Sequence, residues 1–163
     1  VPAVRKMAQS GYAFDFISDR CLDGCKVSSG SILTSPECHP YRTLIIPSCQ
    51  YMPLETLKRI LKLAENGARV VFQQFPLDVP GLYEYEKRRS EMFAQLKMIK
   101  VQEGKNGVGV CKIGKGVVLL SENIENALAY SGIKAESIND FGVKYTKRRL
   151  DAGKIYYLVN HTP

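Results

Sequence analysis

The chain of 163 residues is 45% hydrophobic and 24% charged, proportions that are typical of a single globular domain. No apolar run approaches the roughly 20 residues of a membrane-spanning helix, so we expect no membrane partner. The net charge of +7 is a mild basic bias, and no RNP, zinc-finger or helix-turn-helix pattern accompanies it, so nucleic acid is not an expected partner.

The first part of the chain predicts short elements separated by loops. Residues 2–9 have the pattern of a helix end, which Ser10-Gly11 stops. Residues 12–17 predict a strand, and residues 26–33 predict a short, peripheral strand pair. The chain begins Val-Pro and stops soon after a strand-like run, so we expect a piece of a longer polypeptide.

The stretch YRTLIIPSCQYMPLETLKRILKLAENGARVVFQQF, residues 41–75, predicts a strand, a turn, an amphipathic helix and a second strand. Residues 43–46 are a continuous apolar run, as a strand covered on both faces requires, and Pro47 ends it. From Leu54 onward, apolar residues recur every three or four positions with charged residues between them. Residues 68–72 are the next apolar run. Two parallel strands joined by a right-handed helical crossover are the simplest interpretation.

The second half of the chain predicts two helices and two β-hairpins. The helices cover residues 83–98 and 121–130, the first hairpin residues 108–120, and the second hairpin residues 143–149 and 154–160. A strand follows the glycine-rich turn of the first hairpin, so these glycines do not form a phosphate-binding fingerprint, which leads into a helix. The second hairpin turns at Asp151-Ala152-Gly153.

This order of elements predicts an α/β fold, a three-layer αβα sandwich with a mainly parallel sheet, followed by a C-terminal β-hairpin. We expect the α/β domain to cover residues 1–142. Residues 143–163 differ in character from that body, and we expect them to be the start of a following β-domain.

Ligands of open α/β sheets bind outside the carboxyl ends of the strands, so the segments after the two central strands are the first place to search. Six side chains near the predicted strand ends are candidates for such a crevice: Asp15, Asp19, Cys49, Gln73, Gln74 and Asp78. Capping and turn roles explain the three aspartates equally well. We therefore predict a polar crevice but no catalytic residue.

Cys49 follows the first central strand and precedes the helix, where a helix N-terminus can lower the pKa of a thiol. Its neighbours Ser48 and Gln50 are not the glycines of a nucleophile elbow, which argues against a catalytic role. A thiol-dependent enzyme that uses Cys49 with His39 as its base is one alternative function. The five cysteines lack CxxC spacing, so we predict no metal site. We also expect no cofactor.

Two basic clusters, Lys87-Arg88-Arg89 and Lys147-Arg148-Arg149, interrupt an otherwise dispersed charge pattern. A solvated surface, or a face that docks onto an acidic neighbouring domain, accounts for both. The other alternative function is a binding module for acidic pectic polysaccharide, with these six side chains as its ligand-binding set. Asn160-His161-Thr162 also fits a glycosylation sequon, a short motif that often matches by chance.

Three stretches carry a family resemblance: GYAFDFISDRCL, YRTLIIPSCQYMPLETLKRILKLAENGARVVF and VKYTKRRLDAGKIYYLVNHTP. They resemble the region downstream of the catalytic barrel in glycoside hydrolase family 106, the α-L-rhamnosidase-like enzymes of bacteria. The resemblance implies a fold similar to that of class I glutamine amidotransferases, which is a flavodoxin-like sandwich.

The resemblance also implies that amidotransferase chemistry has been lost. An active amidotransferase would present Gly-x-Cys-x-Gly where this chain has Gln73-Gln74-Phe75-Pro76, and residues 111–122 contain no histidine. The implied function is a non-catalytic domain that braces the barrel of a secreted or periplasmic hydrolase, whose acid and base lie on the barrel. The implied partners are other domains of the same polypeptide and, beyond them, carbohydrate.

Overall fold

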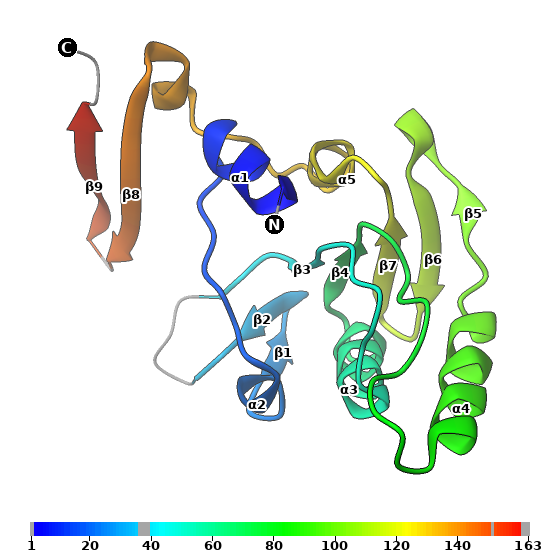
Figure 1. Ribbon diagram of the computed structural model, residues 1–163. Helices are drawn as coiled ribbons and strands as arrows, with labels where there is room; N and C mark the ends of the chain where they lie inside the picture. Colours follow the sequence, from blue (N-terminus) through cyan, green and yellow to red (C-terminus); the bar gives the residue numbers. More distant parts are fainter. Residues whose placement is uncertain (1, 36–39, 151, 161–163) are drawn as a thin grey trace.

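The computed structural model describes residues 2–35, 40–150 and 152–160 (Figure 1). Its helices are α1 Pro2–Gln9, α2 Asp19–Leu22, α3 Leu54–Glu65, α4 Tyr85–Met98 and α5 Ile124–Tyr130, with 3₁₀ turns η1 Lys105–Gly107 and η2 Ser137–Phe141. Its strands are β1 Lys26–Ser28, β2 Ser31–Leu33, β3 Leu44–Ile46, β4 Arg69–Phe72, β5 Gln102–Glu103, β6 Gly109–Ile113, β7 Gly116–Leu120, β8 Val143–Leu150 and β9 Gly153–Asn160.

The main sheet has five strands in the spatial order β3-β4-β7-β6-β5. β3 pairs in parallel with β4, and β4 in parallel with β7, with Val70 opposite both Leu44 and Val118. β6 and β5 then add antiparallel neighbours. The sheet is therefore mixed, and the expectation of a mainly parallel sheet holds only for its first three strands.

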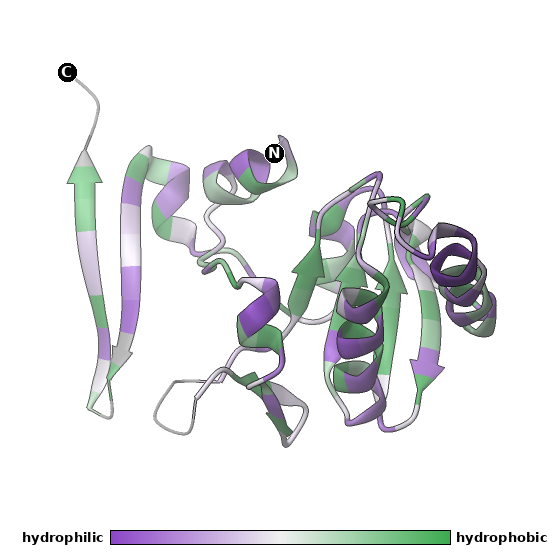
Figure 2. Cartoon of the chain, turned by 60° about the horizontal axis from the view of Figure 1, so that its bottom comes forward, coloured by the Kyte–Doolittle hydropathy of each residue, from purple (hydrophilic) through white to green (hydrophobic). Residues whose placement is uncertain are grey.

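Helix α3 connects β3 to β4 and covers one face of the sheet. Its apolar stripe is buried, with Leu57 and Ala64 wholly inaccessible to solvent, while the charged residues between them face outward. Met92 of α4 packs into the same cluster, beside Val70 and other residues on this face of the sheet. Figure 2 shows the result, with hydrophobic central strands and helices whose outer faces are hydrophilic.

The opposite face of the sheet is covered by α5 and α1. Strand residues alternate between the two faces, so Val71 and Leu119 point away from α3 and pack with Ala127 of α5. Met7 of α1 packs against Leu128 of α5 in a smaller adjoining cluster. The five-stranded sheet is thus flanked by helices on both sides.

Two segments differ from the sequence predictions: residues 12–17 and strand β5. Residues 12–17 are expected to form a strand, but they belong to no helix or strand. Tyr12 and Phe14 instead pack beside α1 and α5, whereas Phe16 is exposed. Strand β5 carried no signal because its two residues, Gln102 and Glu103, are exposed. The short β1-β2 pair lies where it was expected.

The β8-β9 hairpin forms a two-stranded sheet of its own, apart from the main sheet (Figure 1). The Tyr145 hydroxyl donates to the Gly11 carbonyl at 2.5 Å, and the Lys147 ammonium pairs with Glu136 beside η2. The Tyr156 hydroxyl also donates to Glu136, at 3.2 Å. Among the described residues, the hairpin shares no hydrophobic cluster with the body. A few polar contacts hold it there.

Candidate functional site

The site indicated by the fold lies where the connections after β4 and β7 diverge. The chain after β4 leads to α4 on the α3 face, whereas the chain after β7 leads directly to α5 on the opposite face. Such a divergence between neighbouring parallel strands opens a crevice at their carboxyl ends. A cavity of about 240 Å³ lies here, lined by α1, by Gln73 and by the start of α5.

Gln73, directly after β4, spans this crevice with both ends of its amide. Its Oε1 accepts from the Ser48 backbone N–H at 3.1 Å, and its Nε2 donates to the Glu122 carbonyl at 3.1 Å. It therefore ties together the segments that follow β3, β4 and β7. Gln74 adds a second link, since its Oε1 accepts from the Ser48 hydroxyl at 2.9 Å. The polar groups at the strand ends satisfy one another.

The charged groups of the cavity are also paired. The Lys6 ammonium of α1 lies 3.0 Å from a carboxylate oxygen of Glu125 in α5, and the Ser10 hydroxyl donates to the same side chain. These bonds hold the pKa of the Glu125 carboxyl below its ordinary value. The bond from Ser10 has the larger effect, followed by the bond from Lys6. Glu125 is therefore an ionised structural anchor, whereas a general acid would need a raised pKa.

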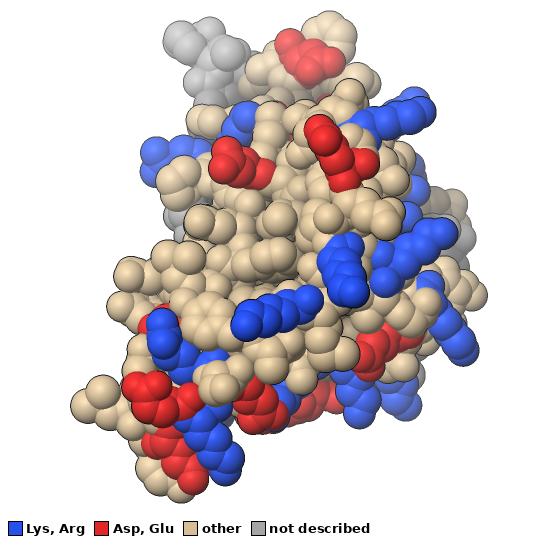
Figure 3. Space-filling view, turned by 90° about the vertical axis from the view of Figure 1, so that its right-hand side faces the viewer, with Lys and Arg blue, Asp and Glu red and all other residues tan. Residues whose placement is uncertain are grey.

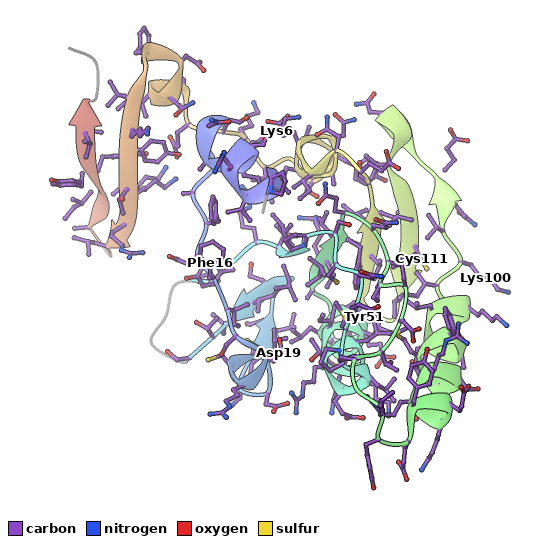
Figure 4. The ribbon with its side chains drawn as sticks, viewed as in Figure 1. Lys6, Phe16, Asp19, Tyr51, Lys100 and Cys111 are labelled. Carbon is purple, nitrogen blue, oxygen red and sulfur yellow. The ribbon has the colours of Figure 1, made fainter. Side chains whose placement is uncertain are left out.

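The three aspartates predicted for the crevice lie apart from it and from one another. Asp19 accepts from the Thr56 hydroxyl of α3 at 2.7 Å, and Asp15 accepts from the Tyr41 hydroxyl at 2.7 Å. Asp78 accepts from the Tyr85 hydroxyl of α4 at 2.6 Å. Figure 4 shows Asp19 well away from Lys6, which lines the cavity. Of the six candidates, the structure brings only Gln73 and Gln74 together at the strand ends. Both bind Ser48, the residue that precedes Cys49 in the sequence.

Cys49 is half-buried and packs against the main core. Burial raises the pKa of its thiol, the opposite of what an activated nucleophile requires. His39, the base considered for a thiol enzyme, lies outside the described residues, as do two residues of the sequon, His161 and Thr162. Among the described residues, no group of three or more His, Cys, Asp or Glu side chains is placed to hold a metal ion.

The two basic clusters lie on different elements, one on α4 and the other on β8. On α4, Arg88 donates to three backbone carbonyls, and Lys87 pairs with Glu84 at 3.6 Å. The Arg89 guanidinium lies 3.4 Å from the Asp78 carboxylate and over the Phe93 ring. On β8, Lys147 pairs with Glu136 and Arg148 lies 3.7 Å from Asp15; the side chain of Arg149 is outside the described part. Figure 3, which faces the α4 side, shows acidic and basic groups interspersed towards its lower edge. The described basic side chains already have partners within the chain.

Sequence reasoning overlooked the contacts that close the crevice. Ser48 was considered only as a neighbour of Cys49, and Lys6 and Glu125 were not considered at all. The two charged residues lie on separate helices far apart in the chain, so no local pattern indicates their pairing. Ser48 had a usable signal, because it lies shortly after an apolar strand, as Gln73 does.

The family model of glycoside hydrolase family 106, described as alpha-L-rhamnosidase, matches residues 3–163. A Formosa agariphila protein named "Putative beta-glucuronidase" is 29% identical over 155 residues, which are 95% of this chain and 12% of that protein.

None of the helices in the described part of the chain is long and apolar enough to cross a membrane.

The structure of a rhamnosidase from Novosphingobium sp. PP1Y superposes on 91% of this chain with a TM-score of 0.71 and 25% identity. The matched region is 14% of that rhamnosidase, so the chain spans only a small part of the length of either relative. Because the family model matches almost every residue, the chain belongs to glycoside hydrolase family 106.

Proposed function

We propose that this chain is a non-catalytic structural domain of a large bacterial rhamnosidase-like glycoside hydrolase, and that it braces the catalytic barrel and an adjoining β-domain. The observation that carries the proposal is the bridge made by Gln73, which occupies the crevice between β4 and β7 with hydrogen bonds to Ser48 and Glu122. A crevice whose polar groups bind one another offers no free acid, base or nucleophile to a substrate.

The proposal includes descent from an amidotransferase-like, flavodoxin-like sandwich. Support comes from the crossover from β3 through α3 to β4 and from helices on both faces of the sheet. Directly after β4, where the nucleophile of an amidotransferase would stand, the chain has the sequence Gln73-Gln74-Phe75-Pro76. Pro76 is buried, so this segment is packed as part of the fold. On this view residues 143–163 begin the following β-domain.

The sizes of the relatives support a role within a larger polypeptide. The matching region is 12% of the Formosa protein and 14% of the Novosphingobium rhamnosidase, so most of each protein lies outside it. We place the acid and base carboxylates of the hydrolase on a barrel outside these residues. A periplasmic or secreted location, as for other enzymes that act on external polysaccharides, is part of the same proposal.

The test compares three proteins on aryl α-L-rhamnosides: the 163-residue chain, the longer polypeptide that carries it, and that polypeptide with the chain deleted. We expect no turnover from the first and turnover from the second. The deletion should lower the thermal midpoint of the polypeptide and reduce activity through that loss of stability. Turnover by the isolated chain at a rate near that of the longer polypeptide would overturn the proposal.

A further inference from the structure

The loop between β4 and α4 ends in two large apolar side chains that point into solvent. Leu82 is 91% exposed and Tyr83 is 81% exposed, and neither belongs to a hydrophobic cluster of the described residues. We propose that these two residues, the Leu82-Tyr83 tip, dock onto an apolar pocket of a neighbouring domain in the same polypeptide. This inference rests on the proposed function as a domain of a larger hydrolase.

The backbone of the tip is fixed by one side chain. Arg88, in the first turns of α4, donates from Nε to the Tyr83 carbonyl at 2.7 Å, from Nη1 to the Pro80 carbonyl at 2.7 Å and from Nη2 to the Gly81 carbonyl at 2.8 Å. A guanidinium group that binds three carbonyls holds the loop in one conformation. Glu84 adopts a left-handed backbone with φ of 45°, an unfavourable state for a non-glycine residue that such bonds help to maintain.

The other end of the loop is held as firmly. The backbone N–H groups of Leu77 and Asp78 both donate to the Gln50 carbonyl, at 3.0 and 3.1 Å. The Asp78 carboxylate accepts from the Tyr85 hydroxyl, and the Val79 side chain is only 2% exposed. The loop is therefore anchored on both sides of the tip, and it runs to the bottom of the view in Figure 1, where α4 begins.

A fixed loop that exposes two apolar side chains has the properties of a binding anchor. Ordering a flexible loop on association costs free energy, and here the loop is ordered before any partner binds. A few anchors that enter well-packed pockets, tyrosine prominent among them, supply most of the free energy of protein interfaces. The side chains of Leu82 and Tyr83 belong to no hydrophobic cluster of the described residues. Docking onto a partner would bury them.

The small size of the tip favours a partner in the same polypeptide. A stable complex of free proteins buries about 1,200–2,000 Å² in total. One aromatic side chain buries roughly 150–250 Å², so two residues fall far short of a free dimer interface. A tethered partner is present at an effective concentration in the millimolar range, where a small contact suffices. Relatives about seven or eight times as long as the matching region offer such partners.

A glycan is a poorer fit to the same surface. Sugar recognition needs hydrogen-bond donors beside the stacking ring, and each of the three Arg88 nitrogens already donates one bond to a backbone carbonyl, which leaves two of its five N–H groups outside these bonds. Leu82, the more exposed of the two residues, has no polar atom in its side chain. The tip is therefore suited to an apolar protein pocket.

The test is hydroxyl-radical footprinting of Tyr83 in the longer polypeptide, with the oxidation rate in denaturant divided by the rate in native buffer. An undocked ring at 81% exposure gives a ratio near one. We expect a ratio of about ten, which corresponds to about 1.4 kcal/mol of docking free energy. Arg88→Ala, which leaves the ring in place but releases the loop, should return the ratio towards one.

A double variant, Leu82→Ser with Tyr83→Ser, should make the polypeptide several-fold more sensitive to protease cleavage between its domains. The matched control is Met98→Ser at the other end of α4, where a side chain 74% exposed is not held by an arginine clamp, and cleavage should not change.

Three results would overturn the inference: a Tyr83 ratio near one, protection that grows with protein concentration, or protection that appears only with added oligosaccharide. These outcomes indicate no partner, a second copy and a glycan, respectively. Each leaves the proposed structural function standing, because that function is tested separately by the activity of the chain and by its deletion.

Discussion

At the scale of single residues, Gln73 is the side chain whose removal should cost most at the strand ends. Gln73→Ala deletes the bonds to Ser48 and Glu122, at 3.1 Å each. Both lie near solvent, so we expect a loss of about 1 kcal/mol in the free energy of unfolding. Urea unfolding monitored by circular dichroism measures it.

Gln74→Ala is the matched control for that prediction. The neighbouring amide is exposed and makes one bond at these strand ends, to the Ser48 hydroxyl at 2.9 Å. Its loss should change the stability by less than about 0.5 kcal/mol. Equal effects from the two variants would contradict the bridging role of Gln73.

Asp78 should make the stability of the chain sensitive to acid. The hydrogen bond from Tyr85, aided by the Val79 N–H and by Arg89, lowers the pKa of this carboxyl. A folded-state pKa below the unfolded value of about 4 means that the stabilisation is complete above that value and is lost as pH falls through the folded-state pKa. Urea midpoints measured from pH 7 to pH 3 should therefore fall.

Two variants separate Asp78 from other acidic groups. Asp78→Asn cannot titrate, so its urea midpoint should start lower at pH 7 and fall less steeply with acid. Tyr85→Phe removes the largest cause of the lowered pKa and should give an intermediate slope. A wild-type slope in Asp78→Asn would assign the acid sensitivity to other carboxylates.

The aspartates also show what the sequence could not predict at this scale. Asp15, Asp19 and Asp78 were expected to face one crevice because each lies near a predicted strand. Their partners are Tyr41, Thr56 and Tyr85, which come from three different segments. Of the capping and turn roles considered for them, only Asp78 shows a local bond, from the Val79 backbone N–H. The direction of each side chain depends on tertiary contacts that no local pattern encodes.

At the scale of elements, the start of β7 packs tightly against the turn that joins α3 to β4. A Cβ atom on Gly116 would lie 2.2 Å from the Ala64 carbonyl oxygen and 2.3 Å from that of Ala68. Both are backbone atoms, which cannot rotate away. Gly116→Ala should therefore lower the free energy of unfolding by about 2–3 kcal/mol, measured by urea unfolding.

Gly24→Ala is the control at the element scale. Its nearest contact would be the Cys21 carbonyl oxygen at 3.7 Å, an ordinary van der Waals distance, and its φ lies outside the left-handed region. We expect a stability within about 1 kcal/mol of the parent, because alanine there only restricts the unfolded chain. A Gly116 variant as stable as this control would show that the β6-β7 turn is not held against α3.

The elements that the sequence predicted well are those whose burial is regular. The period of α3 and the apolar run of β4 reflect burial against neighbours, so their bounds were close, whereas β3 lies at the edge of the sheet and is only partly buried. Residues 12–17 were also expected to form a strand, yet they belong to no strand, and only Tyr12 and Phe14 pack beside α1 and α5. In this segment Phe16 is exposed, so alternation identified neither every covered side chain nor the element that covers it.

At the scale of the whole molecule, hydrophobic packing and polar contacts lie in different regions. The hydrophobic clusters of the described residues belong to the sheet and its helices, together with the β1-β2 pair and the nearby loops. The hairpin is attached through polar groups at Gly11, Asp15 and Glu136. The boundary near residue 142 was a sequence prediction, and this distribution of contacts gives it a physical basis that can be tested by truncation.

A chain that ends at residue 142 should keep the fold of the five-stranded sheet. It loses the bonds of Tyr145, Lys147 and Tyr156, which at about 0.5–1.5 kcal/mol each amount to about 1.5–4.5 kcal/mol. The apolar residues of the sheet remain covered, so unfolding in urea should stay cooperative with an m-value close to that of the full chain. Glu136→Gln, which weakens two of the bonds without removing the hairpin, should reproduce part of the loss. A truncated chain that unfolds without cooperativity would mean that the hairpin belongs to the folding unit of the α/β body, and the boundary at residue 142 would then be wrong.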